Sequence, residues 1–341
     1  MKALIAMPQE RAAADFITLA ALLTQVRGDL AELRRAGEDP RLPTRVKDAI
    51  PAMTTPESYE FQTVSTAYVE TLRHFGVFDR VLADGARRVP LRVALRSTTL
   101  VPTVEPRYEA APAVVGRVEL GANRLAPRAA SGIVVLSNGF IDAGGPALQG
   151  HIERELRRAI VAATDRIFVP ELVSTVGTGM TIASTGDTSA HVKADIKASL
   201  AALGATAESK PFLIASGARV RSLAFMDGDG ETWAWPDLTF AGGNIGGIPV
   251  LPTDAIADDT ALVVDASRIA ADSAGLQIKA SNQGSVRMRD FTETGDGDDL
   301  GAVVSLFQNE LTGLFGERVF GFSPIDDAAV VLSDVNWGDA T

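Results

Sequence analysis

Hydrophobic positions near the start of the chain predict a helix. Between Glu10 and Arg35 they recur every three or four residues, the spacing of one helical face. Gly37 and Pro40 follow and predict its end. The pattern favours either a short heptad seam for another helix or the buried face of an ordinary amphipathic helix, and it leaves both open. The face consists of Phe16, Leu19, Leu23, Val26, Leu30 and Leu33.

A linker, a second helix and a long hairpin are expected next. Residues 38–57 carry four prolines and predict a linker or extended arm, and residues 57–81 predict a helix. Residues 86–136 have a period near two, which predicts two long antiparallel strands joined by a tip near Glu105–Gly116. A hairpin of this kind cannot bury itself. We therefore expect it to lie on something else, such as a neighbouring chain.

A long helix over residues 148–169 is the strongest helical prediction. Its apolar stripe is narrow, charged residues cover the other faces, and Pro146 suits the first turn. One edge of the helix should therefore pack on its own chain. The stripe is Leu148, Ile152, Leu156, Ile160, Ala163 and Ile167. The charges are Glu153, Arg154, Glu155, Arg157, Arg158, Asp165 and Arg166.

The remaining segments predict a mixed α+β protein without regular βαβ alternation. We expect a loop over 175–190, a helix over 189–204, and a strand followed by a helix within 210–226. Strands are expected over 260–267 and 276–288. A helix over 300–319 and a closing strand over 327–337 complete the chain.

Composition narrows the class of protein. A net charge of −11 argues against binding nucleic acid through a basic surface, although it allows a container whose wall does not grip its contents. The chain has no cysteine, no apolar run long enough to span a bilayer and no secretory signal at its start. The basic residues are 26 arginines and 6 lysines, which reflects either arginine pairing at interfaces or genomic base composition.

No motif assembles a chemical site. The stretch "GGNIGGIPVLPTDAI" at Gly242–Ile256 lacks the Lys and the following helix of a phosphate loop, so we interpret it as a tight turn feeding a buried strand, Ile248–Leu251. The acidic runs at 227–229 and 296–299 do not have the spacing of a calcium loop. The histidines, His74, His151 and His191, are scattered, and Glu153 and Glu155 point to different helix faces. We predict no catalytic, cofactor-binding or metal-binding residues and no cofactor.

Several segments in order resemble the major capsid protein of tailed bacteriophages, with the Hong Kong 97-type fold. They are "LSNGFIDAGGPALQGHIERELRRAIVAATDRIFV", "GGNIGGIPVLPTDAI", "ALVVDASRIA" and "SLFQNELTGLFGERVFGFSPIDDAAVVLSDV". The resemblance covers about residues 50–337. It implies a protein that self-assembles into hexamers and pentamers of an icosahedral shell and encloses double-stranded DNA. Its place would be the virion capsid, assembled in the cytoplasm of the bacterial host.

The resemblance also implies a domain organisation. Residues 1–57 would be an N-terminal helix and arm, 58–91 the start of a peripheral domain and 92–136 an extended β-hairpin loop over the adjacent subunit. Residues 137–190 would hold the spine helix, 191–290 the axial domain and 291–341 a peripheral-domain helix with the closing strand. Residues 1–50 are either a scaffolding segment removed by a head protease or a retained arm.

Some members of this family join their subunits by a Lys–Asn isopeptide bond, assisted by a glutamate. Here Asn309 falls at the acceptor position, Gly316 replaces the glutamate, and residues 92–136 contain no lysine. We therefore expect no such bond. The implied partners are other copies of the chain, a portal, a scaffold or head protease and decoration proteins, with no membrane. Two alternatives remain: an encapsulin-like nanocompartment shell and a soluble α+β enzyme with an unrecognised site.

Overall fold

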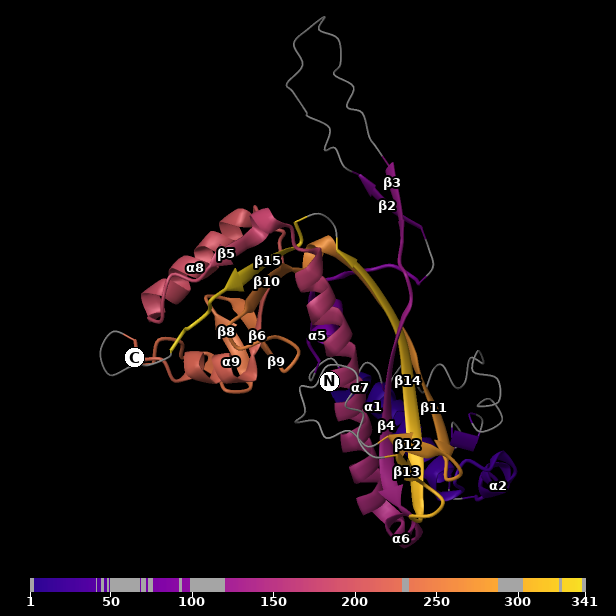
Figure 1. The fold of residues 1–341 in the computed structure, drawn as a ribbon. Helices are drawn as coiled ribbons and strands as arrows, with labels where there is room; N and C mark the ends of the chain where they lie inside the picture. The colour runs from indigo at the N-terminus through magenta and orange to yellow at the C-terminus, as the bar shows by residue number, and fades with distance from the viewer. Residues whose placement is uncertain are drawn as a thin grey trace, which may run out of the picture. The chain divides into compact units, whose positions relative to one another are not determined.

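The computed structural model describes residues 3–40, 42–43, 46–47, 49, 68, 72, 76–91, 94–98, 120–228, 233–287, 303–324 and 327–338. The chain is mixed α+β, as predicted. It divides into two compact units (Figure 1). Unit 1 comprises 1–79, 129–167 and 274–319, and unit 2 comprises 80–128, 168–273 and 320–341.

Unit 1 is built on the long helix α7 (Gly145–Thr175), which contributes its residues up to Ile167. The helix lies along strands of a sheet in which β11 (Ile269–Ser281), β14 (Leu311–Pro324) and β4 (Arg128–Ser137) are neighbours (Figure 1). Helix α1 (Ala3–Gln25) completes the core. The core brings together Phe16, Leu19, Leu23, Leu148, Ile152, Leu156, Ile160, Leu276 and Leu314. The narrow stripe of α7 therefore packs inside its own unit, as predicted.

Helix α7 is longer than the predicted 148–169. It continues through Pro170 to Thr175, although proline removes a helical hydrogen bond. Phe168, Val169 and Leu172 are fully buried, and burying these side chains offsets that loss. The buried face of the helix shifts by one residue after Ile160, from Ala163 and Ile167 to Thr164 and Phe168. Ala163 and Ile167 are therefore only half-buried, while Asp165 is buried. The expectation that Asp165 faces outward was wrong.

The predicted N-terminal helix is two helices. Helix α2 (Leu30–Ala36) follows α1 after a turn in which Gly28 has φ +84. A Cβ on Gly28 would lie 1.9 Å from the Ala280 carbonyl oxygen, so only glycine fits there. Asp29 caps α2 by accepting a hydrogen bond from the Ala31 N–H, at 2.8 Å, and α2 ends at Gly37 as expected. The apolar face of α1 packs within unit 1, as in an ordinary amphipathic helix.

Most of the linker and second helix predicted before residue 81 lies outside the described residues. Gly76 is not helical, and a separate helix α5 (Val77–Asp84) begins after it. The helix predicted over 57–81 is therefore not continuous. Strand β1 (Arg87–Arg88) follows and pairs in parallel with the start of β11 in unit 2.

The predicted hairpin is confirmed over two short strands and wrong at its base, where residues 87–88 and 128–136 belong to another sheet. Strands β2 (Ala94–Thr98) and β3 (Leu120–Arg124) pair antiparallel over five residue pairs. Residues 125–127 interrupt the strand. The next strand, β4, pairs with β14 in the sheet along α7. A short helix, α6 (Asn138–Ala143), follows β4. The predicted tip, Glu105–Gly116, lies outside the described residues.

The helix predicted over 300–319 was wrong. The described residues form strand β13 (Val303–Ser305), a turn, and strand β14. Alternate residues of β14 are buried, which is the period of a strand. Two of these buried positions are Gly316 and Arg318. Because neither residue is apolar, the alternation of apolar and polar residues that predicts a strand is not visible in the sequence. Strand β13 pairs with β12 (Ser285–Arg287), so the strand predicted over 276–288 is also interrupted.

Unit 2 is built on a seven-stranded mixed sheet in the order β5-β15-β10-β6-β9-β8-β7. Helices α8 (Ser189–Ala202) and α9 (Gly217–Ala224) pack on the face formed by Leu213, Ala215, Ala261, Val263, Val330 and Leu332. The strands are β5 (Thr181–Ala183), β6 (Pro211–Ser216), β7 (Leu238–Thr239), β8 (Gly242–Ile245), β9 (Ile248–Thr253), β10 (Ala261–Asp265) and β15 (Ala329–Ser333). Short 3₁₀ helices cover Thr178–Met180 and Ala266–Arg268.

These elements confirm most of the central predictions. Strands β6, β10 and β15 and helices α8 and α9 lie where the patterns placed them. The interpretation of Gly242–Ile256 is also confirmed, because Gly246 and Gly247 form a two-residue turn with φ +58 and +85 before the buried strand β9. The loop predicted over 175–190 is not wholly irregular, since β5 pairs there with β15.

Candidate functional site

Three polar side chains from distant parts of the sequence meet in the interior of unit 1. The guanidinium of Arg318 donates to both carboxylate oxygens of Asp79, at 2.9 and 2.5 Å, and lies 5.2 Å from the centre of the Phe78 ring. Arg318 is fully buried and Asp79 is 4 % exposed. A buried pair with this geometry is costly to break, because each partner compensates the charge of the other.

Asp165 lies beside this pair and holds the start of α5. Its carboxylate accepts hydrogen bonds from the backbone N–H groups of Val77, at 3.0 Å, and Phe78, at 3.1 Å. Burial raises the pKa of Asp165 to about 6, against the lowering effect of these two hydrogen bonds. The position of the carboxylate at a helix N-terminus explains its role, which is to cap the helix.

Asp195 is the corresponding buried carboxylate of unit 2. It accepts hydrogen bonds from the hydroxyls of Ser184 and Thr185, both at 2.7 Å, and from the indole N–H of Trp337 at 2.9 Å. The backbone N–H of Thr185 adds another at 3.1 Å. With its acceptor sites occupied, this carboxylate joins β5, α8 and the end of the chain and is not placed to move a proton.

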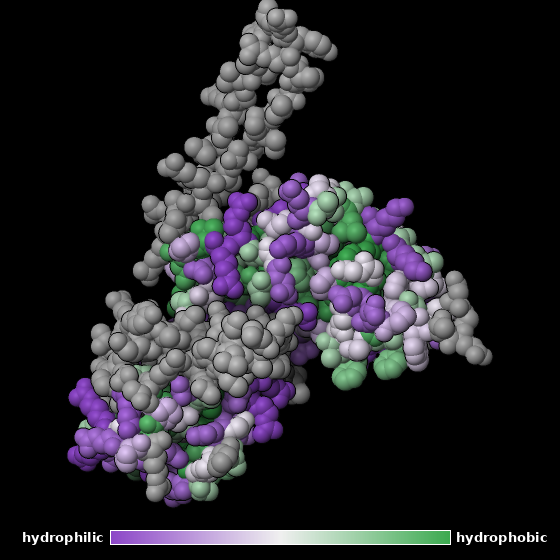
Figure 2. All heavy atoms as spheres, turned by 180° about the vertical axis from the view of Figure 1, so that it is seen from behind, coloured by the Kyte–Doolittle hydropathy of each residue, from purple (hydrophilic) through white to green (hydrophobic). Residues whose placement is uncertain are grey.

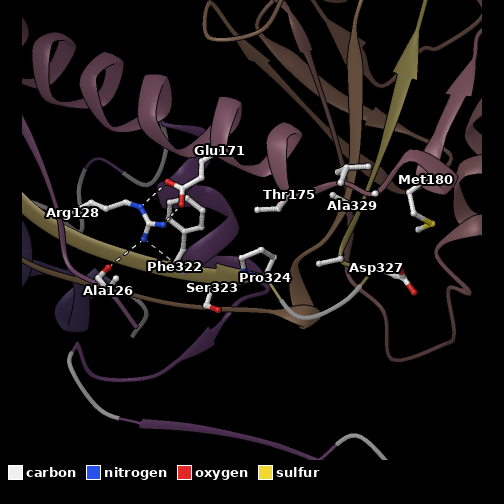
Figure 3. A pocket seen from close by; sticks show the side chains of 13 residues that line it. Ala126, Arg128, Glu171, Thr175, Met180, Phe322, Ser323, Pro324, Asp327 and Ala329 are labelled. Carbon is white, nitrogen blue, oxygen red and sulfur yellow. Dashed lines mark hydrogen bonds and ion pairs between the residues drawn. The ribbon is translucent and has the colours of Figure 1, made fainter. Parts of the chain in front are cut away.

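A pocket of about 610 Å³ in unit 2 is built around Arg128 (Figure 3). Arg128 forms an ion pair with Glu171, in which its Nε donates to Oε2 at 2.7 Å. Its Nη1 donates to the carbonyls of Ala126 and Phe322, at 3.2 and 3.3 Å, and the guanidinium lies 4.3 Å from the centre of the Phe322 ring. The other lining residues include Thr175, Met180, Ser323, Pro324 and Asp327. Arg128 and Glu171 pair with each other, and among the lining residues no nucleophile is joined to a base.

The two histidines within the described residues have local contacts of their own. The rings of His151 and Phe140 are nearly perpendicular, with their centres 5.5 Å apart, and His191 contacts the Thr188 hydroxyl at the start of α8. His74 lies outside the described residues. Within the described ranges, no group of three or more His, Cys, Asp or Glu could hold a metal ion. No helix there is long and apolar enough to cross a membrane.

The other sequence candidates have local roles. Asn309 is exposed in the turn before β14, and its side-chain amide donates to the Ser305 carbonyl at 2.8 Å. Gly316 lies in β14 against Leu156, where a Cβ would approach to 2.8 Å. Glu153 pairs with Arg157 one turn along α7. Of the acidic runs, Asp227 forms an isolated bridge with Trp233, while residues 296–299 lie outside the described part.

Sequence reasoning missed Asp79, Arg318 and Asp195. One signal existed for Arg318, which occupies a buried position in the period-two pattern of β14 between Leu314 and Phe320. An arginine in such a place predicts a buried acidic partner, although the pattern does not identify which. No comparable signal marks Asp79, because its partner lies 239 residues away.

Several large apolar side chains are exposed on the surfaces of the two units. Large hydrophobic residues of unit 2 reach solvent at Phe225, Trp233 and Phe240. Figure 2 shows apolar side chains at the lower edge of this unit among hydrophilic ones. In unit 1 the exposed hydrophobic residues are Ile133, Phe140, Val303 and Phe307. Contiguous groups of this kind are typical of surfaces that contact another macromolecule, whereas singly exposed ones are common on any protein.

Comparisons with known proteins give matches among solved structures alone. No family model and no curated protein matches the sequence. A structure from Mycobacterium phage Bobi aligns with 74 % of this chain and 89 % of its own, with 15 % identity and a TM-score of 0.49. One from Gordonia phage Cozz covers 73 % and 84 %, with 16 % identity and a TM-score of 0.49. The holo-SrpI encapsulin complex from Synechococcus elongatus covers 75 % and 87 %, with 12 % identity and a TM-score of 0.41.

Proposed function

We propose that this chain is a shell-forming structural protein, the major capsid protein of a tailed phage or prophage. Copies assemble into hexamers and pentamers of an icosahedral shell that encloses double-stranded DNA. The ordered segments that resemble this family support the proposal, and so does the arrangement of α7 along the β11–β14–β4 sheet. The buried polar groups described above have structural partners, which favours a non-enzymatic role.

One observation carries the proposal: the β2–β3 ribbon. In the described part of the chain these two strands form a sheet of their own and pair with no third strand. A two-stranded ribbon is at best marginally stable in water, so it needs a surface on which to lie. A neighbouring copy of the chain supplies that surface in a shell, where the ribbon belongs to the extended loop that the resemblance implies within residues 92–136.

Charge supports the same conclusion. Residues 92–136 contain six arginines, three glutamates and no lysine or aspartate, a net charge of +3. The whole chain carries −11, so the remaining residues carry −14. A basic ribbon on an otherwise acidic chain is attracted to another copy, and this attraction steers association between copies. The acidic remainder also keeps the shell wall from gripping DNA during packaging.

The finer parts of the proposal follow the family resemblance. Residues 191–290 form the axial domain around the capsomer centre, and residues 58–91, 137–190 and 291–341 form the peripheral domain. A portal, a scaffold or head protease and decoration proteins are the other partners, and assembly takes place in the host cytoplasm. The proposed function depends on a conformational change, in which skewed capsomers rearrange into a thinner and wider shell as DNA enters.

Negative-stain electron microscopy with sedimentation velocity tests the proposal. The purified protein, alone or co-expressed with its neighbouring gene products, should give hollow icosahedral shells or discrete rings. A variant in which Arg92, Arg96 and Arg124 become glutamate should lose assembly without losing its fold, because the ribbon then repels the acidic remainder. Its matched control replaces the same residues with lysine and keeps the charge. A monomer under all conditions would overturn the proposal, and shells containing cargo enzymes in place of DNA would favour a nanocompartment.

A further inference from the structure

Two large aromatic side chains form an exposed pair on unit 2. Phe225 is 62 % exposed and Trp233 is 54 % exposed. Their ring centres lie 5.8 Å apart with the planes at 74°, an edge-to-face contact. Single exposed hydrophobic residues are common, but two adjacent rings that are both mostly in solvent are a candidate contact surface.

The pair stands on a rigid base. Phe225 ends α9, and its N–H donates to the Arg221 carbonyl at 3.2 Å. Met226, the next residue, is buried, and its carbonyl accepts a hydrogen bond from the Ala234 N–H at 2.9 Å. Backbone hydrogen bonds therefore hold the chain beside both rings, and the edge-to-face contact joins the rings to each other. Rings that are already ordered lose little conformational entropy on binding, which is a property of interface hot spots.

A third exposed ring belongs to the same part of the unit. Phe240 is 66 % exposed in the turn between β7 and β8, and α9 packs against β7. An aromatic side chain offers about 200 Å² of surface, so the three rings expose on the order of 350 Å². A stable two-body interface needs roughly 800 Å² from each partner. The rings alone are therefore too small to make a lasting dimer.

The surrounding charges narrow the choice of partner. Arg221, Asp227 and Asp237 are all exposed near the pair, so both signs are present. Nucleic acid and acidic membranes need a basic surface, which these residues do not provide. A mixed border around an apolar centre instead suits another protein surface of the same kind. An area too small for a dimer is sufficient in an assembly, where other contacts between the same copies add to it.

We propose that Phe225 and Trp233 pack against a second copy of this chain as the apolar centre of a self-assembly interface. This inference rests on the proposed shell function and names a surface through which it operates. If the pair meets a different surface of the next copy, the contact is heterologous, and heterologous contacts form rings when the rotation between copies closes.

Tryptophan fluorescence provides a direct test. The chain has three tryptophans, and Trp235 and Trp337 are 8 % and 0 % exposed. Acrylamide added to unassembled protein therefore quenches Trp233 almost alone. On assembly, the quenching constant should fall roughly threefold or more, as expected for a ring that enters the dry centre of an interface. The Trp233→Phe variant gives the baseline, since its remaining tryptophans should be quenched equally weakly in both states.

Paired variants complete the test. Phe225→Ser combined with Trp233→Ser should keep the circular dichroism spectrum and melting profile of the wild type but lose assembly. The matched pair Phe225→Leu and Trp233→Phe keeps the surface apolar and should still assemble. If wild-type assemblies leave Trp233 fully quenchable, or if the serine variant assembles normally, the inference is overturned and the shell function stands. If the wild type never assembles, both fall together.

Discussion

The buried pair of Arg318 and Asp79 offers the most quantitative prediction. Replacing Asp79 with leucine removes two hydrogen bonds and leaves a fully buried guanidinium without its acidic partner. The expected loss in the free energy of unfolding is about 3–5 kcal/mol, as is typical when one partner of a buried pair is removed. Replacing Arg318 with methionine should also destabilise the chain, because Asp79 is then buried without a cation.

The double variant measures how much of each single loss comes from the interaction between Asp79 and Arg318. Leucine at position 79 with methionine at position 318 replaces two charges by apolar groups of similar volume, so its stability should lie within about 1 kcal/mol of the wild type. The two single losses should therefore far exceed the loss in the double variant. This non-additivity is expected for groups in direct contact.

Urea unfolding of the unassembled protein measures these differences. Circular dichroism is the appropriate signal, because all three tryptophans lie in unit 2 whereas the pair lies in unit 1. Arg158→Ala is the matched control, since Arg158 is an exposed arginine on α7 and should change stability by less than about 0.5 kcal/mol. A loss below about 1 kcal/mol for Asp79→Leu, or strict additivity of the two single variants, would refute the reasoning.

Three further predictions concern single residues. Burial raises the pKa of Asp165 from 3.8 to about 6, so the folded state favours the protonated carboxyl group more than the unfolded state does. The resulting contribution to the free energy of unfolding is complete below about pH 4 and is lost as the pH rises through 6. Urea titrations should therefore show Asp165→Asn gaining ~2–3 kcal/mol relative to the wild type between pH 4 and 7, and a constant difference would contradict this. Gly28→Ala should cost more than about 2 kcal/mol in thermal unfolding, since its Cβ would meet the Ala280 carbonyl, whereas Gly139→Ala, with open space around it, should not. Mature particles should run as a single band on a denaturing gel, and a ladder that disappears in Asn309→Ala would show the cross-link predicted to be absent.

Local patterns were sufficient wherever one period was unambiguous. The stripe of α7, the apolar runs of β6 and β10 and the glycine pair before β9 each specified the right element. They failed where the period was masked by residues with tertiary roles. The pattern of β14 favours a helix because Gly316 and Arg318 occupy buried positions that apolar residues usually fill. Gly28 was passed over for a similar reason, since its requirement comes from a carbonyl more than 250 residues later.

The sequence by itself determined the element types with clear periodicity, the mixed α+β class, the acidic balance and the basic ribbon segment. These depend on residues close together in the chain or on simple counts. Only the tertiary structure decided the partners of Arg318 and Asp195, the joining of β4 to β14 in preference to the hairpin, and the exposure of the Phe225–Trp233 pair. Burial and pairing depend on which distant segments come together, and the local pattern at one residue does not contain that information.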